Sequence, residues 1–318
     1  MKRVKEGNNQ ESSKAIQTYQ KFLRTKMIHK RTFQIAKESL SRQHVKNTKA
    51  HTWRLLRPTM EMDDGTLKIL MKMIKSTKIT RKLDFIITWP PKITVLGIHH
   101  FYQSLKNSIA IRKIALSASA LYKTSDEGLY FLCKSLKRLR FLEELTIQIL
   151  AFKNINNTGF YILGEALKSL NSLRTIRLSV EYVHVYLENY SRRNEGPEKI
   201  LKSLKNCHSL QNLRIVFYDA NFMNLESLSK ALKKLRLLQR ISLKFESCNV
   251  NDDGLLCLSE GLQNLVFLEF LCLKFKRCWD ITDLAISEVE EHLSELLSET
   301  EIEVSNSFTY GLNEDFER

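Results

Sequence analysis

The sequence predicts an α/β solenoid, with parallel strands lining one face and helices lining the other. Two observations support this fold class. One apolar pattern is repeated along most of the chain, and the expected strand starts recur with a mean period of about 31 residues. Within each copy, the spacing of apolar residues changes from a helical rhythm to strict alternation.

The repeat is visible from six marks, at Gly97, Gly128, Gly159, Gly196, Asn224 and Gly254. The positions 1, 4, 8, 11, 14, 17, 19 and 21 residues after these marks are apolar in 46 of 48 cases, and only Ser108 and Pro197 depart. A chain with 43% hydrophobic residues would give roughly half that number by chance. Weaker copies flank the array at residues 63–87 and 281–304.

The spacing also assigns each half of the repeat. Steps of three and four residues place one apolar stripe on a helix of about three turns. Steps of two, as at Leu145, Ile147 and Ile149, place alternate side chains on one face of a strand. The first inward strand positions are expected at 83, 114, 145, 176, 213, 241, 271 and 302. A helix between successive strands makes neighbouring strands parallel. One unit is too small to fold alone, so successive units must stack.

Charge divides the chain into three domains. Residues 1–60 hold 15 Lys or Arg and 3 acids, so they are predicted to be a basic N-terminal extension. Residues 61–305 are the solenoid, and residues 306–318 an acidic tail. Residues 279–318 together hold 12 acids and one Arg. Ile16, Tyr19, Phe22, Leu23 and Met27 have helical spacing, so we expect the extension to be partly helical and to cap the solenoid, dock on a partner or touch a membrane.

Composition excludes several classes of protein. No apolar run is long enough for a spanning helix, and no secretory leader is evident, so we expect a cytoplasmic or nuclear protein. The six cysteines form no C-x-x-C pair, which argues against a sequence-evident zinc site. No nucleophile elbow, P-loop or zinc-protease motif is present, so we expect no enzyme and no cofactor. The acidic pairs Asp63–Asp64, Asp126–Glu127 and Asp252–Asp253 recur just before helices and are expected to be helix caps.

The strand segments resemble those of leucine-rich-repeat proteins. The signature Leu-x-x-Leu/Ile-x-Leu/Ile begins at Leu142, Leu173, Leu210, Leu238 and Leu268. The long helical half is similar to the ribonuclease-inhibitor-like subtype, and the segments at Cys248 and Cys278 also resemble the cysteine-containing subtype. The resemblance implies a horseshoe of about eight repeats, with strands on the concave face and helices on the convex face. It also implies that Cys248 and Cys278 bond backbone groups between turns, while Leu121, Phe152, Val183 and Ala220 replace them elsewhere.

Two candidate surfaces follow from this architecture. Outward positions on the strands form a diagonal basic band, with Arg240 beside it. The band comprises Arg177, Arg214, Lys244 and Lys274. The long loop after the fourth strand carries Tyr182, Tyr186 and Tyr190 every four residues, which suits a hot spot on one helical face. The alternative for the band is that its long side chains extend into water. The alternative for the tyrosines is that their rings cover the solenoid.

The leading functional prediction is a non-catalytic scaffold that binds an acidic protein on the concave face and the tyrosine loop. One alternative is a nucleic-acid or ribonucleoprotein-associated component that uses residues 1–60. Another is a substrate receptor of a ubiquitin ligase, implied by the resemblance to the cysteine-containing subtype, although no F-box-like motif precedes the repeats.

Overall fold

The structure is a computed structural model of the 318-residue chain. It describes residues 63–65, 67–69, 83–88, 94–105, 111–117, 126–151, 157–182, 196–220, 225–294 and 300–305. The basic N-terminal extension and the acidic tail predicted at 1–60 and 306–318 lie outside these residues.

Strands and helices alternate along the described chain, as the repeat predicts. The strands are β1 (Leu83–Thr88), β2 (Ile111–Ser117), β3 (Glu144–Ala151), β4 (Thr175–Tyr182), β5 (Asn212–Tyr218), β6 (Arg240–Glu246), β7 (Phe270–Lys276) and β8 (Thr300–Ser305). The helices are α3 (Val95–Leu105), α4 (Asp126–Leu136), α5 (Asn157–Leu167), α6 (Gly196–Leu204), α7 (Glu226–Leu232), α8 (Asp252–Leu262) and α9 (Asp283–Ser294).

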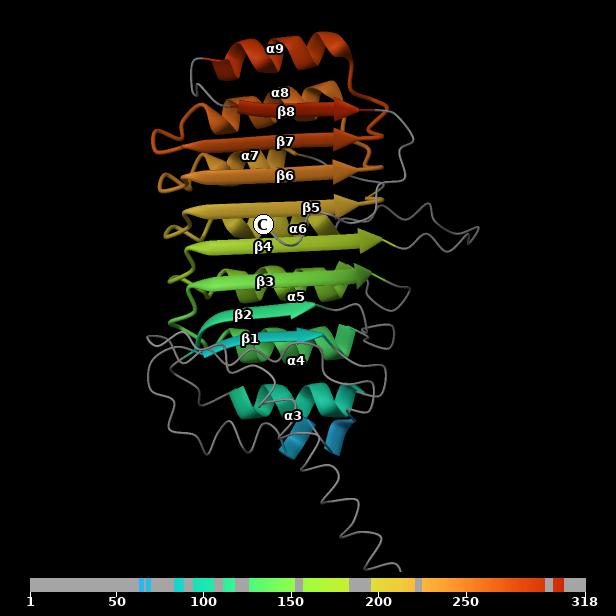
Figure 1. The fold of residues 1–318 in the computed structure, drawn as a ribbon, viewed down its shortest axis with the longest axis vertical. Helices are drawn as coiled ribbons and strands as arrows, with labels where there is room; N and C mark the ends of the chain where they lie inside the picture. The colour runs from blue at the N-terminus through green and yellow to red at the C-terminus, as the bar shows by residue number, and fades with distance from the viewer. Residues whose placement is uncertain are drawn as a thin grey trace, which may run out of the picture.

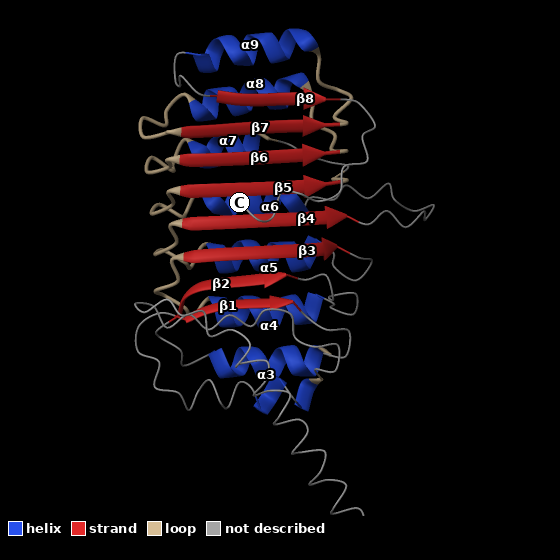
Figure 2. Ribbon diagram, viewed as in Figure 1, coloured by secondary structure: helices blue, strands red, loops and turns tan. Residues whose placement is uncertain are grey.

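The described strands form one eight-stranded sheet in chain order, β1 to β8, and every neighbouring pair is parallel. Figures 1 and 2 show the strands stacked as an open sheet with the helices on one side of it. The fold is therefore an α/β solenoid of leucine-rich-repeat type, and the fold prediction is confirmed. Because the sheet is open and little curled, we call its outward side the strand face.

The predicted inward positions form the core between sheet and helices. Leu145, Ile176, Leu213, Ile241 and Leu271 lie side by side in the register and are all buried. Further along the strands, the buried rings of three successive turns stack with nearly parallel planes. Their centroids are 6.3 Å apart for Phe217–Phe245 and 5.4 Å for Phe245–Phe275. The same side chain at the same position of each turn builds a continuous apolar spine.

The chain leaves three successive strands through the same backbone turn. Asp219, Ser247 and Arg277 follow β5, β6 and β7, with φ of 56°, 53° and 54°. The amide of Asp219 donates to the carbonyl of Glu246, and that of Ser247 donates to Lys276, both at 2.8 Å. The first two exit turns are thus bonded to the next strand, which keeps them regular.

The register differs from the sequence prediction at the two ends of the sheet. Phe85, and not Leu83, lies opposite Ile114, because the pairing shifts between Leu83 and Asp84. At the other end, Leu271 pairs with Thr300, and Ile302 pairs with Leu273. A slip of two residues preserves the alternation of the backbone register, so the fold tolerates it. Within the described residues, no helix is both long and apolar enough to cross a membrane.

Candidate interaction surface

The register places the predicted basic band as expected on the central strands. Arg177 on β4 lies directly opposite Arg214 on β5. Two positions further along, Lys244 on β6 lies opposite Lys274 on β7. Arg240 begins β6 on the same face, because it is four residues before Lys244. The structure therefore brings the five cations onto neighbouring strands of one face.

Two carboxylates that the sequence prediction missed partly neutralise this band. Glu144 accepts from Lys113 at 2.8 Å, and its Oε2 lies 3.9 Å from Nη1 of Arg177. Glu246 accepts from Lys244 at 3.4 Å and from Arg277 at 2.5 Å. Strand alternation could have found both, since Glu144 and Thr146 share one face of β3, as Lys244 and Glu246 share one face of β6.

Aromatic rings also hold two of the cations. The guanidinium carbon of Arg240 lies 4.8 Å from the centroid of the Phe270 ring, and Nζ of Lys244 lies 5.4 Å from that of Tyr218. Such contacts orient a cation without removing its charge. Arg177 is the most open member of the band, with 47% of its side chain exposed.

The strand face is not wholly polar. Val216 and Cys272 alternate with inward residues, yet they are only 4% and 6% exposed. Val216 lies beside Lys244 in the register, and Cys272 lies beside Ser242. Cys272, predicted to face outward, therefore does so by register but is covered.

The prediction that Tyr182 lies on a helical turn of the loop is wrong, because β4 extends to this residue. Tyr182 is the last residue of β4 and pairs with Ala151 of β3. Tyr186 and Tyr190 lie outside the described residues, and so does the loop that carries them.

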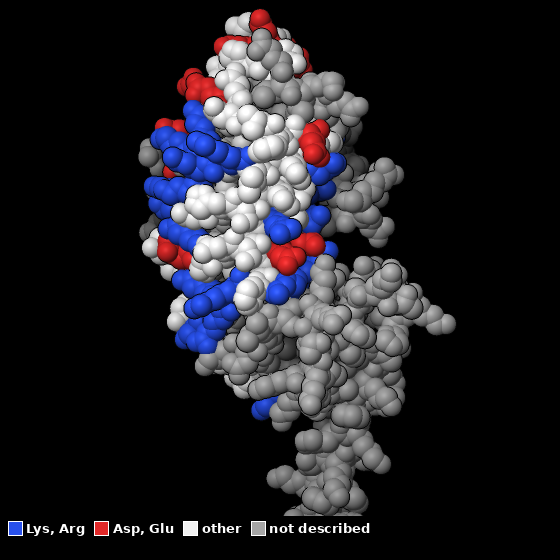
Figure 3. Space-filling model, turned by 90° about the vertical axis from the view of Figure 1, so that its left-hand side faces the viewer, with Lys and Arg blue, Asp and Glu red and all other residues white. Residues whose placement is uncertain are grey.

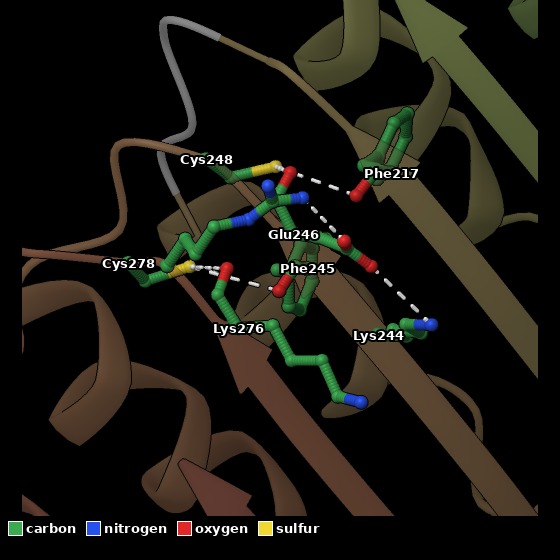
Figure 4. A network of polar contacts seen from close by, with 8 residues as sticks. Phe217, Lys244, Phe245, Glu246, Cys248, Lys276 and Cys278 are labelled. Atoms are coloured by element: carbon green, nitrogen blue, oxygen red, sulfur yellow. Dashed lines mark hydrogen bonds and ion pairs between the residues drawn. The ribbon is translucent and has the colours of Figure 1, made fainter. Parts of the chain in front are cut away.

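Cysteines link successive turns where the sequence predicted them (Figure 4). The thiol of Cys248 donates to the carbonyl of Phe217 at 3.5 Å, one turn back along the chain. The thiol of Cys278 donates to the carbonyl of Phe245 at 3.7 Å. Burial raises the pKa of Cys248 to about 12 and that of Cys278 to about 11. Neither thiol is ionised near neutral pH, so both have a structural role.

Two of the three acidic pairs link turns through one carboxylate, Asp64 or Asp252, which differs from the prediction that they cap their own helices. Oδ1 and Oδ2 of Asp252 accept from the amide and the hydroxyl of Thr282, both at 2.8 Å. Asp64 accepts from Thr94 in the same way. The start of α8 is capped instead by Asn251, which accepts from the amide of Gly254 at 3.1 Å. These carboxylates therefore hold the next turn, and they are not an acid–base pair.

The pair His99–His100 lies in α3, beside a small hollow of about 110 Å³ between α3 and α4. His99 stacks on Phe131 with centroids 4.2 Å apart, and its Nε2 lies 2.9 Å from Nε2 of Gln103. Among the described residues, no three His, Cys, Asp or Glu side chains gather where they could hold a metal ion. The histidines pack against the helical layer.

No family model and no curated protein sequence matches the chain. Three solved structures show distant likeness. The complex of Rad7 and Elc1 from yeast is 12% identical, covering 92% of this chain and 72% of that one, with a TM-score of 0.42. Actin-binding site 2 of leiomodin-1 is 17% identical, covering 52% and 84%, with a TM-score of 0.37. A protein from Bacteroides fragilis is 13% identical, covering 74% and 69%, with a TM-score of 0.35.

Each TM-score lies below 0.5, so the partners of these proteins carry nothing over to this chain. The fold assignment rests on the strand order and register described above.

Proposed function

We propose that the chain is a non-catalytic scaffold that binds a protein partner with an acidic surface on the strand face. The observation that supports the proposal best is the adjacent pair Arg177 and Arg214. Like charges on neighbouring strands repel one another, and a carboxylate of a partner would relieve that cost. Arg177 is open to solvent, and its nearest acid in the described chain, Glu144, is 3.9 Å away and also binds Lys113.

The five cations differ in what they would contribute. Lys244 already has Glu246 and the ring of Tyr218, so its charge is partly satisfied within the chain. Arg177 and Arg214 can each present a planar guanidinium to a carboxylate, which suits bidentate recognition. We therefore expect Arg177, whose side chain is 47% exposed, to contribute more to affinity than Lys244, whose side chain is 15% exposed.

Two further features bear on the repeat subtype and the compartment. Helices of mostly 9–12 residues in a period of about 31 are in keeping with the ribonuclease-inhibitor-like subtype. The six cysteines are all free, and all but Cys257 are buried, as is usual in a reducing compartment such as the cytoplasm or nucleus.

The test is affinity purification with a triple charge-reversal variant, Arg177→Glu, Arg214→Glu and Lys244→Glu. The matched control carries three Arg→Glu changes at Arg140, Arg174 and Arg236, which lie on helix-to-strand turns away from the strand face. We expect a partner recovered with the wild type and the control to be lost from the strand-face variant. Equal recovery by all three proteins would refute the proposal.

A further inference from the structure

A second basic surface lies along the turns that lead from each helix into the next strand. The turns at 137–143, 168–174, 205–211 and 233–239 carry three, two, one and three Lys or Arg, against one acid, Glu143. All these cations are exposed. We call this surface the basic edge; its cations are Lys137, Arg138, Arg140, Lys168, Arg174, Lys205, Lys233, Lys234 and Arg236.

The basic edge is a continuous column. Figure 3 looks at the side of the molecule where the strands begin, and it shows Lys and Arg gathered in a band along the stack, beside an uncharged strip. The next turn, at 263–269, has no Lys or Arg and one acid, Glu269. The column therefore ends at the turn before β7.

Most of this charge is not neutralised within the described part of the chain. Lys168 pairs with Glu165, and Lys233 pairs with Glu260 at 3.3 Å. The other seven cations of the basic edge form no ion pair with a described residue. Cations held this close with so few acids favour an anionic ligand.

The same helix-to-strand turns carry groups that recognise more than charge. Phe141 is 50% exposed, and its ring lies 4.8 Å from the guanidinium carbon of Arg112. His208 is exposed at the position equivalent to Arg140, and Asn171 occupies the same position one turn earlier. Rings that stack on bases, together with amides that bind phosphate or sugar, are typical of nucleic-acid surfaces.

The dimensions also suit a linear phosphate chain. Neighbouring strands are about 4.8 Å apart, so the three steps from β3 to β6 cover about 14 Å. In a base-stacked strand each nucleotide advances about 3.4 Å along the axis, so at most about four phosphates would face the column. An anionic membrane would instead favour apolar tips on every turn. Two of the four turns carry Ser172 and Ser209 where Phe141 and Leu237 stand on the others.

We propose that the basic edge binds a single-stranded nucleic acid, with its Lys and Arg on the phosphates and Phe141 and His208 against bases. This surface is separate from the strand face, so the inference does not depend on the proposed protein partner.

The test is fluorescence anisotropy of the full-length chain with a labelled oligouridylate of about 16 nucleotides, the upper end of single-strand site sizes. The edge variant carries Arg140→Glu, Arg174→Glu and Arg236→Glu. Each lost phosphate contact lowers the slope of log affinity against log salt by about 0.7, so the slope should fall by about 2. Affinity at low salt should fall about tenfold or more.

The strand-face variant Arg177→Glu, Arg214→Glu and Lys244→Glu has the same change in net charge and is the matched control. We expect it to bind the oligonucleotide like the wild type, apart from a weak general charge effect. Equal loss in both variants, or none in the edge variant, would overturn the proposal and assign binding to net charge or to residues 1–60. Stronger binding to phosphatidylserine vesicles or to polyglutamate than to the oligonucleotide would also overturn it.

Discussion

At the scale of single residues, burial determines which side chains are chemically available. Burial raises the pKa of Cys207 to about 12, as it does for Cys248, and raises that of Cys133 still further. Cys257 is the one cysteine of the six that is only partly buried. Thiol chemistry of the folded protein should therefore be confined to one site.

We predict that, near pH 8, a maleimide reagent modifies Cys257 quickly and the other five cysteines only after unfolding, because all five are buried. The thiols of Cys207 and Cys248, with a pKa of about 12, are also almost entirely protonated at that pH. Mass spectrometry of the alkylated protein measures this. The Cys257→Ser variant should lose the fast reaction. Rapid modification of several cysteines would contradict the burial of the other five thiols.

A second residue-scale prediction concerns the acidic ends of β4, β5 and β6. Burial, and then the charges of Asp219 and Glu246, raise the pKa of Glu181. The folded state therefore holds the proton more tightly than the unfolded state. This contribution favours folding below the ordinary pKa of a glutamate and is lost as pH rises through the raised value.

Glu181→Gln should accordingly raise the midpoint of thermal unfolding slightly at pH 7, by about 1 °C, and much less at about pH 3.5. Differential scanning fluorimetry at the two pH values measures the difference. Glu290→Gln, on the exposed side of α9, is the control and should show no such difference. A lower midpoint for the Glu181 variant at pH 7 would contradict the assignment.

At the scale of elements, helices of neighbouring turns are held together by side-chain hydrogen bonds and by close packing. Asp252 accepts two hydrogen bonds from Thr282, while Asp253, one residue later, is exposed. We predict that Asp252→Ala lowers the free energy of unfolding by about 1–2 kcal/mol, because it removes both bonds to the start of α9.

Asp253→Ala removes a neighbouring carboxylate from the same helical turn. It should lower the free energy of unfolding by less than about 0.5 kcal/mol. Urea denaturation compares the two variants. Equal losses would mean that the helix dipole, and not the contact with Thr282, is responsible.

Helices α7 and α8 pack closely at Gly261. A Cβ added at Gly261 would lie 2.8 Å from both Cα and Oγ of Ser229. We predict that Gly261→Ala lowers the free energy of unfolding by about 1–3 kcal/mol, because the backbone of α7 must move.

Gly65→Ala is the control, because its Cβ would meet its nearest atom, Oδ1 of Asp63, at 3.4 Å. Helix propensity makes that change neutral or slightly stabilising. Urea denaturation of both variants distinguishes steric conflict from a general intolerance of alanine.

At the scale of the whole molecule, the sequence predicts most of the fold because one constraint is repeated many times. Inward residues such as Leu145, Ile176 and Leu213 fix both the strand face and the register, since a slip of one residue would expose all of them. The ends were predicted less well. A two-residue slip at Leu83 or Ile302 leaves the period of two unchanged, so periodicity alone cannot detect it.

The candidate surfaces were harder to predict than the core. The positions of Arg177 and Lys244 follow from strand alternation. Their pairing with Glu144 and Glu246 depends on the side-chain conformations, which the alternation does not give. The basic edge was missed because its cations are scattered through the sequence, in turns about 30 residues apart. Only stacking of the turns brings Arg140 and Arg236 into one column.

The unbroken strand order has a consequence for how the protein is made. Each described strand pairs only with its neighbours in the sequence, so no pairing between these strands has to wait for a distant segment. A ribosome releases residues slowly compared with the closure of such short loops. The growing polypeptide can thus wind onto its own finished portion during translation, and its apolar surface is covered almost as soon as it leaves the exit tunnel.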